Sequence, residues 1–298
     1  MDLSIIIVNW NTRPLLERCL ESIFRAAGNL SVEIFVVDNA SKDDSQEVLK
    51  KRFQGRVNLI FNEKNLGFAK ANNQALKRAK GHFILFLNPD TEVLGDDLIK
   101  IVKLMRRNRD YGVVGCQLIG VDGEIQPSVR RFPTLISQIL ILLKLHQLFP
   151  QLEPLADYYA YDFDYRKLQE VDQVAGAFFM VRREVFEEVG LLDENFFIWF
   201  EEVDFCKRVK EAGWKVVYTP EVKILHHGAQ SFGQVLPFRK QRIFNRSLIY
   251  YFKKHHSKIA IRILRCFSPI SLFLAFLIQL IRVVTKSSGR RFVNPYRR

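Results

Sequence analysis

The chain has 298 residues, of which 48% are hydrophobic and 26% charged, enough for one large α/β domain with an appendage or for two small domains. Its four cysteines are scattered and form no CxxC pair, which argues against a zinc site or a disulfide framework and favours a reducing, cytosolic setting. The first residues pass directly into an apolar run without a basic region or a small-residue cleavage site, so we expect no secretory signal peptide.

The net charge of +13 is distributed unevenly along the chain. The last acidic residue is Glu221, and the segment 222–298 holds 16 Lys or Arg and no Asp or Glu. The first 221 residues carry 29 basic and 32 acidic side chains, a nearly even balance. The pattern therefore indicates a nearly neutral globular body followed by a strongly cationic tail.

In the first third of the chain, β-branched apolar runs alternate with helical patterns. We predict strands at 3–8, 33–38, 57–61 and 82–87, with helices at 14–27, from 41–45 to about 53, and at 69–79. This alternation is typical of a parallel sheet with right-handed crossovers and helices on both faces.

Polar residues follow three of these predicted strands, where strand ends of an open α/β sheet form a ligand crevice. They are Asn9 and Trp10, Asp38 and Asn39, and Asp90. A carboxylate such as Asp90 at the end of a buried strand most simply holds a hard cation against phosphate oxygens, although Asn-Pro-Asp is also ordinary turn chemistry. The absence of GxGxxG after the first strand and of GxxxxGK[ST] disfavours dinucleotide oxidoreductases and P-loop enzymes. A metal held by Asp90 is then the simplest way to neutralise a diphosphate.

The second half of the chain contains further acidic and histidine candidates. We predict strands at 113–118, 173–181 and 215–220, a short helix at 184–189 and another through Lys210. Glu201, Glu202 and Asp204 follow the aromatic run 196–200. The helix macrodipole accounts for part of this clustering, but carboxylates beside apolar walls also have raised pKa values and can serve as general bases. His226 and His227 precede a glycine and could complete a metal shell or bind phosphate.

Taken in order, these motifs resemble the inverting family 2 glycosyltransferases of GT-A fold, and within them the rhamnosyltransferase-like branch. The resemblance covers roughly residues 1–235 and depends on the order and spacing of its motifs. The motifs are Val8-Asn9-Trp10-Asn11, Val37-Asp38-Asn39-Ala40-Ser41, Asn65-Leu66-Gly67-Phe68-Ala69-Lys70-Ala71-Asn72-Asn73, Leu87-Asn88-Pro89-Asp90, Val174-Ala175-Gly176-Ala177, Glu201-Glu202-Val203-Asp204 and His226-His227-Gly228-Ala229-Gln230-Ser231.

The resemblance implies an α/β, Rossmann-like nucleotide-diphospho-sugar transferase domain at 1–235, followed by a helical extension at 236–298. Asp38 would contact the nucleotide base or ribose, and the Asn9-Trp10 backbone would line the base pocket. Gly67, Phe68 and Asn72 would pack beside the nucleotide, because glycine permits close backbone approach. The nucleotide-sugar-binding set is completed by Asn39 and Asn88.

The resemblance also implies a divalent cation, Mg²⁺ or Mn²⁺, bridging the donor diphosphate. Asp90 would coordinate it as the last carboxylate of the family's DxD motif. The first acidic position is Asn88 here, a variation similar to the rhamnosyltransferase-like members, which leaves one charged ligand from the motif. His226 matches the histidine of the family's HxGxxS loop and would complete the metal or diphosphate site.

The family's catalytic base is the second acid of a Glu-Asp pair, which maps onto Glu202, with Asp204 next in rank. This chain has Glu where Asp is usual, so either the acceptor sits slightly farther from the backbone or Asp204 takes the role. A carboxylate in this place would deprotonate an acceptor hydroxyl as it attacks the anomeric carbon. One displacement would invert that centre without a covalent glycosyl-enzyme.

The segment 236–298 is predicted to be basic, partly apolar and membrane-associated. Residues 266–281 carry no charge, and a full span needs about 20 apolar residues. Because Pro269 shortens the run further, we expect an interfacial or re-entrant helix rather than a transmembrane span. Flanking Arg and Lys would lie against anionic headgroups. A second apolar segment, 135–149, is either an acceptor-side membrane contact or a core helix.

The predicted function is transfer of a sugar from a nucleotide-diphospho-sugar to a lipid-linked or polysaccharide acceptor in bacterial cell-surface glycan synthesis, such as O-antigen assembly. By resemblance the leading donor is dTDP-rhamnose, and the expected location is the cytoplasmic face of the cell membrane. The alternatives are a UDP- or GDP-sugar donor, or a non-catalytic nucleotide-sugar-binding protein, because Asn88 and Glu202 both depart from the commonest pattern. No nucleic-acid partner is expected, since the positive charge brackets a lipid-like run.

Overall fold

The computed structural model describes residues 1–228 and 233–287, with side chains up to Ile281. Within these residues the chain folds as two compact units. The first comprises Met1–Arg130, Phe163–Phe197 and Glu201–Gly233, and the second comprises Arg131–Asp162, Ile198–Phe200 and the chain from Gln234 onward. The helices after residue 234 thus share a unit with 131–162, while the domain boundary at 235 stays a prediction.

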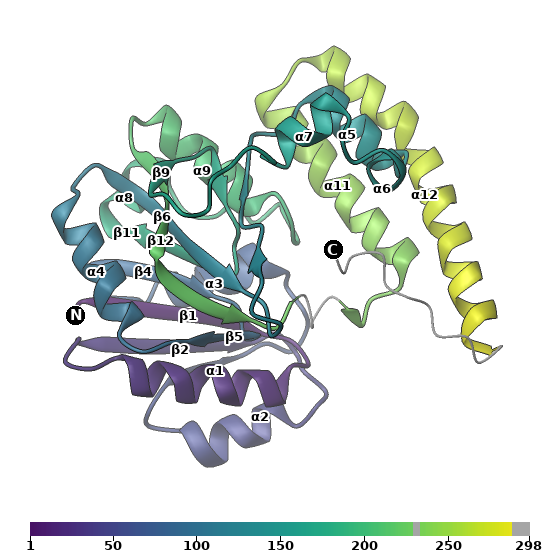
Figure 1. The fold of residues 1–298 in the computed structure, drawn as a ribbon. Coiled ribbons are helices and arrows are strands. Elements are labelled where there is room, and N and C mark those ends of the chain that lie inside the picture. The colour runs from purple at the N-terminus through teal and green to yellow at the C-terminus, as the bar shows by residue number, and fades with distance from the viewer. Residues whose placement is uncertain (229–232, 288–298) are drawn as a thin grey trace. The chain divides into compact units, whose positions relative to one another are not determined.

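A twisted mixed sheet forms the centre of the first unit (Figure 1). Its main path runs β3-β2-β1-β4-β11-β6-β12-β5, with β7 beside β6 and β9 beside β12. The bounds are β1 Leu3–Asn9, β2 Val32–Asp38, β3 Asn58–Phe61, β4 Phe83–Leu87, β5 Thr91–Val93, β6 Tyr111–Ile119, β7 Ile125–Gln126, β9 Gln169–Glu170, β11 Phe178–Arg182 and β12 Lys215–His226. β3, β2, β1 and β4 are parallel, as predicted. Beyond β4 the sheet is mixed, because β11 runs antiparallel to both β4 and β6.

Helices of the first unit cover both faces of this sheet. Their bounds are α1 Arg13–Ala26, α2 Ser45–Val48, the π-helical turn η1 Leu49–Phe53, α3 Phe68–Leu76, α4 Asp97–Arg107, α8 Arg183–Val189 and α9 Glu201–Glu211. On one face, Leu20 of α1 and Ile101 of α4 share a buried cluster with Ile5 of β1. On the other, Phe86 of β4 contacts the rings of Phe179 and Phe186 at centroid distances of 6.3 and 6.1 Å. This second, aromatic face lies under the start of α9.

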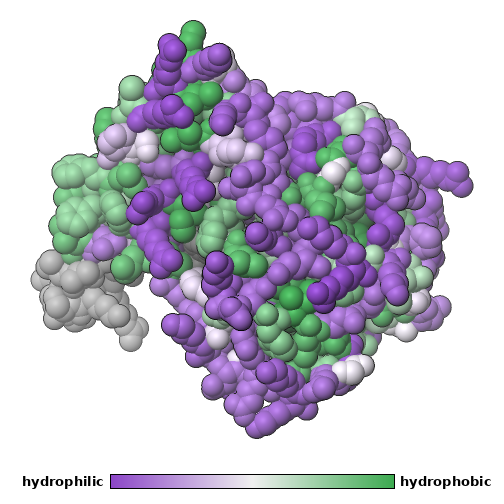
Figure 2. All heavy atoms as spheres, turned by 180° about the vertical axis from the view of Figure 1, so that it is seen from behind, coloured by the Kyte–Doolittle hydropathy of each residue, from purple (hydrophilic) through white to green (hydrophobic). Residues whose placement is uncertain are grey.

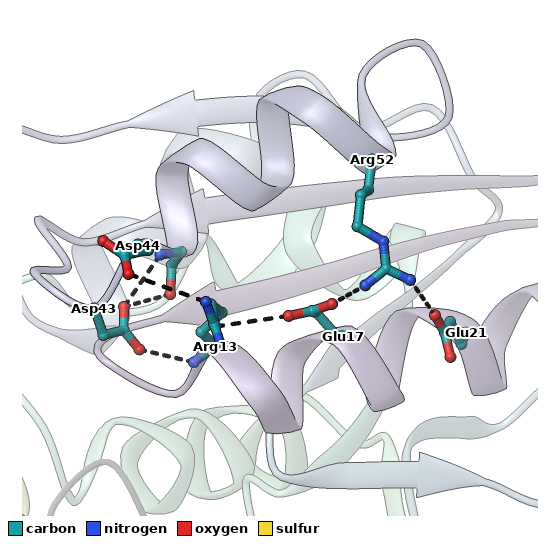
Figure 3. Close-up of polar contacts among 7 residues, drawn as sticks. Arg13, Glu17, Glu21, Asp43, Asp44 and Arg52 are labelled. Carbon is teal, nitrogen blue, oxygen red and sulfur yellow. Dashed lines mark hydrogen bonds and ion pairs between the residues drawn. The ribbon is translucent and has the colours of Figure 1, made fainter.

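Ion pairs fasten α1 to the segment that follows β2 (Figure 3). Arg52 of η1 pairs with Glu17 and, at 2.7 Å, with Glu21, one turn further along α1. At the start of α1, the main-chain nitrogen of Arg13 donates to Oδ2 of Asp43 at 2.8 Å. Exposed ion pairs of this kind each contribute only about 0 to 1 kcal/mol, so they align the helices more than they stabilise the fold.

The run 173–181, predicted as one strand, is divided between two sheets. Gln173–Val174 (β10) pairs with Val129–Arg130 (β8) in a separate two-stranded sheet, whereas Phe178–Arg182 belongs to the main sheet. A turn at Ala175-Gly176-Ala177 separates them. An unbroken apolar run reads the same whether one sheet or two bury it, so periodicity alone does not reveal the break.

β12 is longer than predicted and reaches the edge of the sheet where β5 follows Asp90. It continues past Pro220 to His226, and its pairing with β6 changes register between Thr219 and Lys223. Proline is tolerated at such an irregularity because it has no N–H for the ladder. The extension places His226 opposite Thr91 of β5.

The second unit is helical. Its helices are α5 Leu135–Leu142, α6 Leu145–Leu148, α7 Glu153–Tyr158, α11 Pro237–His255 and α12 Lys258–Ser287. α12 packs against α11 and α5, and Nδ2 of Asn245 on α11 donates to Oγ of Ser268 and Oγ of Ser271 at 2.9 and 2.8 Å. The segment 135–149 is only partly buried, since Leu142 is inside while Ile136 and Phe149 are exposed.

α12 passes through Pro269 without ending, so the expectation that this proline shortens the helix is wrong. The helix exposes a row of large apolar side chains, and Figure 2 shows hydrophobic surface at the left of that view. They are Ile259, Ile270, Phe273, Phe276, Leu277, Leu280 and Ile281. Within Lys258–Ile281, an 18-residue window has a mean hydropathy of 1.9, and by length and composition alone this helix could cross a membrane.

Candidate active site

Asn9 and Asp38 lie side by side at the ends of β1 and β2. Nδ2 of Asn9 donates to Oδ2 of Asp38 at 2.9 Å, while Oδ1 of Asp38 accepts from the main-chain nitrogen of Ser41 at 3.0 Å and from Nε2 of Gln46 at 2.7 Å. Both Asn9 and Asp38 are fully buried. Their polar atoms hold the two strand-end loops together, and Trp10, the next residue after Asn9, is half-buried.

Both of these loops contain a non-glycine residue in the left-handed region, which the sequence did not reveal. Asn11 has a φ of 53° and Ala40 a φ of 64°. Oγ of Ser41 accepts from the main-chain nitrogen of Asn11 at 2.9 Å, and Oδ1 of Asn11 accepts from that of Lys42 at 2.6 Å. Strained residues that a hydrogen-bond network keeps in place are commonest at ligand-binding sites.

The side chain of Asn39 organises the loop that leads into α3. Its Nδ2 donates to Oδ1 of Asn65 at 2.9 Å, and its Oδ1 accepts from the main-chain nitrogen of Leu66 at 2.9 Å. Asn72, on the next turn of α3, donates from Nδ2 to the carbonyl of Phe68 at 3.0 Å. Its Oδ1 is buried and has no hydrogen-bond partner among the described residues.

Gly67 makes room for the main chain of Phe197. Its φ is +87°, and a Cβ at this position would lie 2.9 Å from Cα of Phe197. The main-chain nitrogen of Phe68 donates to the carbonyl of Phe197 at 2.6 Å. Nδ2 of Asn73, also on α3, donates to the carbonyl of Leu192 at 2.8 Å. The segment that precedes the acidic cluster is therefore held against the start of α3.

Asp90 and His226 are brought together at the ligand edge, from opposite halves of the sequence. Oδ1 of Asp90 lies 3.6 Å from Nε2 of His226. Nδ1 of His226 is 2.6 Å from Oε1 of Gln126, whose Nε2 donates to the His226 carbonyl at 3.1 Å. Because this second bond orients the amide, Oε1 faces the ring and Nδ1 carries the proton. The lone pair of Nε2 is left facing Asp90, as a metal-binding histidine requires.

Asp90 and His226 can hold a divalent cation only if other groups supply the remaining ligands. Asp90 is buried, while the side chain of Asn88, two residues earlier, has no hydrogen bond to a described residue. No cluster of three or more His, Cys, Asp or Glu that could hold a metal occurs in residues 1–228 and 233–287. A hard cation takes at least six ligands, so the others have to come from water or from phosphate oxygens. The residues Ala229, Gln230 and Ser231 of the histidine loop lie outside the described ranges.

The two candidate bases on α9 have different surroundings. Oδ2 of Asp204 accepts from Nε of Arg208 at 2.9 Å, and the Asp204 side chain is fully buried. Glu202 is partly exposed to solvent, but its Oε2 is buried and has no hydrogen-bond partner among the described residues. Loss of hydration raises the pKa of Glu202, although nearby backbone N–H groups and the charge of Arg130 oppose the rise.

Glu202 borders a small void on the aromatic face of the sheet. The void has a volume of about 10 Å³, close to the space that one water molecule needs. Phe68, Phe86 and Gly176 are among the residues that line it, together with Glu201 and Glu202. A carboxylate, apolar walls and room for one oxygen atom thus occur together at the start of α9.

Two left-handed residues, Trp199 and Phe200, directly precede the acidic cluster in the chain. Their φ angles are 65° and 70°, and each such residue costs about 1–2 kcal/mol. Within the second unit, the ring of Phe200 contacts those of Phe244 and Tyr251 at 5.4 and 5.5 Å. These aromatic contacts offset the strain, which the sequence showed only as an aromatic run.

Comparisons with known proteins identify relatives of this chain. The chain is 28% identical over 243 residues to the N-acetylglucosaminyl-diphospho-decaprenol L-rhamnosyltransferase of Mycobacterium tuberculosis, and the match covers 78% of each chain. It is 28% identical over 242 residues to the rhamnosyltransferase WbbL of Escherichia coli K12, covering 76% of this chain and 85% of WbbL.

Solved structures establish the fold. The mannosyltransferase PcManGT from Pyrobaculum calidifontis, in complex with GDP-Man and Mn²⁺, superposes with a TM-score of 0.58 at 15% identity, covering 97% of this chain and 76% of that one. GalNAc-T7 with UDP, GalNAc and Mn²⁺ also gives 0.58 at 18% identity, covering 85% of this chain and 50% of that one, so the chain spans half the length of GalNAc-T7. The predicted GT-A fold is confirmed.

The family follows from a match that extends across most of the central sheet. The profile of glycosyl transferase family 2 covers residues 4–190, from β1 to the end of α8, and so includes the strand ends at Asn9, Asp38 and Asp90. The predicted activity class is thereby confirmed: the protein is a glycosyltransferase, and the chain belongs to glycosyl transferase family 2.

Proposed function

We propose that this enzyme transfers a sugar from a nucleotide-diphospho-sugar with inversion of the anomeric centre, and that Glu202 is the catalytic base. The observation that carries the proposal is the buried Oε2 of Glu202, which has no hydrogen-bond partner among the described residues and borders an apolar void. A carboxylate whose pKa is raised by burial binds a proton more tightly than an ordinary glutamate. Such a group is suited to take the proton of an acceptor hydroxyl near neutral pH.

Asp204 has a positioning role in this proposal. Asp204 forms an ion pair with Arg208, and the Arg208 guanidinium also donates to the carbonyl of Leu191 at 3.0 Å. The pair therefore links the first turn of α9 to the main chain at Leu191. A carboxylate held in a buried ion pair is a weak base, because protonation would leave the arginine uncompensated. The direction of the Glu202 side chain then depends on a helix start that Asp204 keeps in place.

Asp90 and His226 are the proposed protein ligands of a divalent cation, Mg²⁺ or Mn²⁺. The fit depends on the facing Oδ1 and Nε2 atoms and on Gln126, which fixes the proton on Nδ1 of His226. When bound, the cation would stabilise the negative charge of the leaving diphosphate. Because few protein ligands are available, we expect the cation to bind weakly unless the nucleotide is present.

The donor and acceptor are inferred from the relatives. Two are named rhamnosyltransferases, and the name of the mycobacterial one specifies a diphospho-decaprenol-linked acceptor. They support transfer of rhamnose to a lipid-linked glycan in cell-surface glycan synthesis, and dTDP-rhamnose as the donor rests on the family resemblance alone. The exposed apolar side chains of α12 and the basic residues on either side of residues 266–281 support a location at the cytoplasmic face of the membrane. The proposed nucleotide-sugar-binding residues are Asn9, Trp10, Asp38, Asn39, Gly67, Phe68, Asn72 and Asn88.

The first test is a thermal-shift series with dTDP, UDP, GDP and NAD, each with and without Mn²⁺. We expect one nucleoside diphosphate to stabilise the protein only when the metal is present, which also identifies the base of the donor. A shift with UDP or GDP instead of dTDP would replace the rhamnose donor. No shift with any diphosphate would contradict the donor class.

The second test compares Glu202→Gln with Glu187→Gln, which changes an exposed glutamate of α8. We expect Glu202→Gln to keep donor binding and to lower turnover by about 10²- to 10⁴-fold, the usual contribution of a general base. Glu187→Gln should have wild-type turnover. NMR of the product gives the anomeric configuration, and retention instead of inversion would refute the single displacement.

A further inference from the structure

The second unit contains a pocket of about 360 Å³ that the catalytic proposal does not use. Residues from α5, α6, α11 and α12 line it. One part of the lining is basic, with Lys144, His146 and Lys240, and no Asp or Glu of the described residues lines it. Trp199 and Phe244 are among its apolar side chains. The pocket therefore combines positive charge with aromatic and aliphatic walls.

Lys144 is the most unusual residue of this pocket. It joins α5 to α6 in the left-handed region, with a φ of 62°, and its Nζ donates to Oε1 of Gln241. No carboxylate among the described residues forms an ion pair with it. Loss of hydration lowers its pKa to about 8. An ammonium taken out of water without a counter-charge is unfavourable, and an anionic ligand would supply that charge.

The surroundings of the pocket favour a ligand with a long apolar part. Ala275 and Ile278 of α12 belong to its lining, together with Trp199, Phe244 and Ile141. A hydrocarbon chain attached to an anion held at Lys144 could continue along these side chains and bury apolar surface. A free inorganic anion would leave the apolar walls unused.

The geometry points to a binding site for the phosphate or diphosphate group of a lipid, with the phosphate beside Lys144 and Lys240 and the hydrocarbon chain against Trp199, Phe244 and α12. Charge-assisted hydrogen bonds from ammonium groups to phosphate oxygens would hold the head group. This inference rests on the proposed function in one respect: the lipid it takes is the lipid end of the acceptor.

The test measures binding to the full chain by quenching of tryptophan fluorescence, since Trp199 lines the pocket. Farnesyl phosphate is the probe, and farnesol and inorganic phosphate test its two halves separately. We expect farnesyl phosphate to bind at least about tenfold more tightly than either, because only it uses both the basic and the apolar lining. Equal binding of farnesol would reduce the pocket to an apolar groove, and equal binding of inorganic phosphate would make it a plain anion site; either result overturns the inference.

Variants locate the site. Lys144→Gln and Lys240→Gln should each weaken farnesyl phosphate binding by about tenfold, the usual effect of losing one charge-assisted hydrogen bond. Lys144→Arg keeps the charge and should retain most of the affinity, and Lys253→Gln, at an exposed position of α11, should bind like the wild type. Trp199→Phe should remove most of the fluorescence response. Unchanged binding in both lysine-to-glutamine variants would place the lipid elsewhere.

Donor binding and farnesyl phosphate binding, both measured on the wild-type chain, separate this inference from the proposed function. Circular dichroism of each variant shows whether it folds, and Lys240→Gln provides a second variant if Lys144→Gln does not. Donor binding is followed by thermal shift on the wild-type chain. Donor binding without farnesyl phosphate binding would refute the lipid site alone, whereas lipid binding without donor binding would refute the proposed function alone.

Discussion

Asp204 and Arg208 form an ion pair of 2.9 Å across one turn of α9, with Asp204 fully buried and Arg208 partly exposed, whereas Oε2 of Glu202, two residues before Asp204, is buried without a hydrogen-bond partner among the described residues. Neighbouring carboxylates on one helix therefore have different electrostatic environments. The first stabilises the helix start, and the second is available to accept a proton. This difference favours Glu202 over Asp204 as the base.

We expect Asp204→Asn to destabilise the fold by about 3–5 kcal/mol, because removing one partner of a buried ion pair leaves the arginine uncompensated. Urea unfolding of the two proteins measures the difference. Glu211→Gln, which removes an exposed ion pair with Lys207 on the same helix, should cost about 1 kcal/mol or less. If Asp204→Asn is as stable as the wild type but inactive, Asp204 is the base and our assignment fails.

The raised pKa of Glu202 predicts two pH effects. Turnover should fall as the pH drops through this raised value, because the base must be ionised. Stability should change in the opposite sense: the native state binds the Glu202 proton more tightly than the unfolded chain, so this contribution is present at low pH and is lost as the pH rises through the native pKa. Glu202→Gln cannot titrate, so the stability of the wild type relative to this variant should decrease from pH ~4 upward. A constant difference between the two unfolding curves would contradict the shift.

Gln126 is expected to act on the cation through His226. Gln126→Ala should weaken Mn²⁺-dependent donor binding by about 10- to 100-fold, as losses of a partner behind a metal-bound histidine commonly do. Asp90→Asn should abolish the metal dependence altogether. Calorimetric titration of the donor with and without Mn²⁺ measures both effects, and Glu124→Gln, on the same hairpin and exposed, is the control. Equal affinities for wild type and Gln126→Ala would show that the histidine is oriented by other groups or is not a ligand.

The exposed apolar side chains of α12 are expected to hold the protein to membranes. Replacing Phe273, Phe276 and Leu280 together by Ser should lower partitioning onto anionic liposomes more than tenfold, since each buried side chain contributes about 1.5–3 kcal/mol. These changes are more selective than deletion of 236–298, because Phe244 and Tyr251 of α11 pack against Phe200. Co-sedimentation measures the effect, and a triple variant that still sediments with vesicles would rule out this surface as the anchor.

Much of the fold was predictable because its first half is built from local signals. Strand runs such as 3–8 and 82–87 alternate with amphipathic helices, and each is bounded by turn residues close to where the structure ends it. The antiparallel β11 and the split of 173–181 were not, since strand direction depends on partners that are distant in sequence. For the same reason no local pattern could reveal that 131–162 shares a unit with α11 and α12.

The site was predictable where a motif brought chemistry with it. Asp90 was expected to coordinate the cation and His226 to complete the metal or diphosphate site; their facing atoms lie 3.6 Å apart, and their role as ligands stays a prediction. Gln126 could not have been found, because one amide in a two-residue strand has no distinctive pattern. Asp38 was expected at the nucleotide, but its oxygens accept three hydrogen bonds from its own loops and from Asn9, contacts that only the folded chain creates.

The contact of Gly67 with Phe197 has a consequence for how the family motif is interpreted. A side chain at residue 67 would collide with the main chain that leads to the acidic cluster, whether or not a sugar nucleotide is present. The steric requirement for glycine at this position therefore comes from assembly of the site, independently of the donor. A relative without the proposed base or metal ligands would still need the glycine for this contact, so its presence in a sequence indicates the architecture and not catalytic competence.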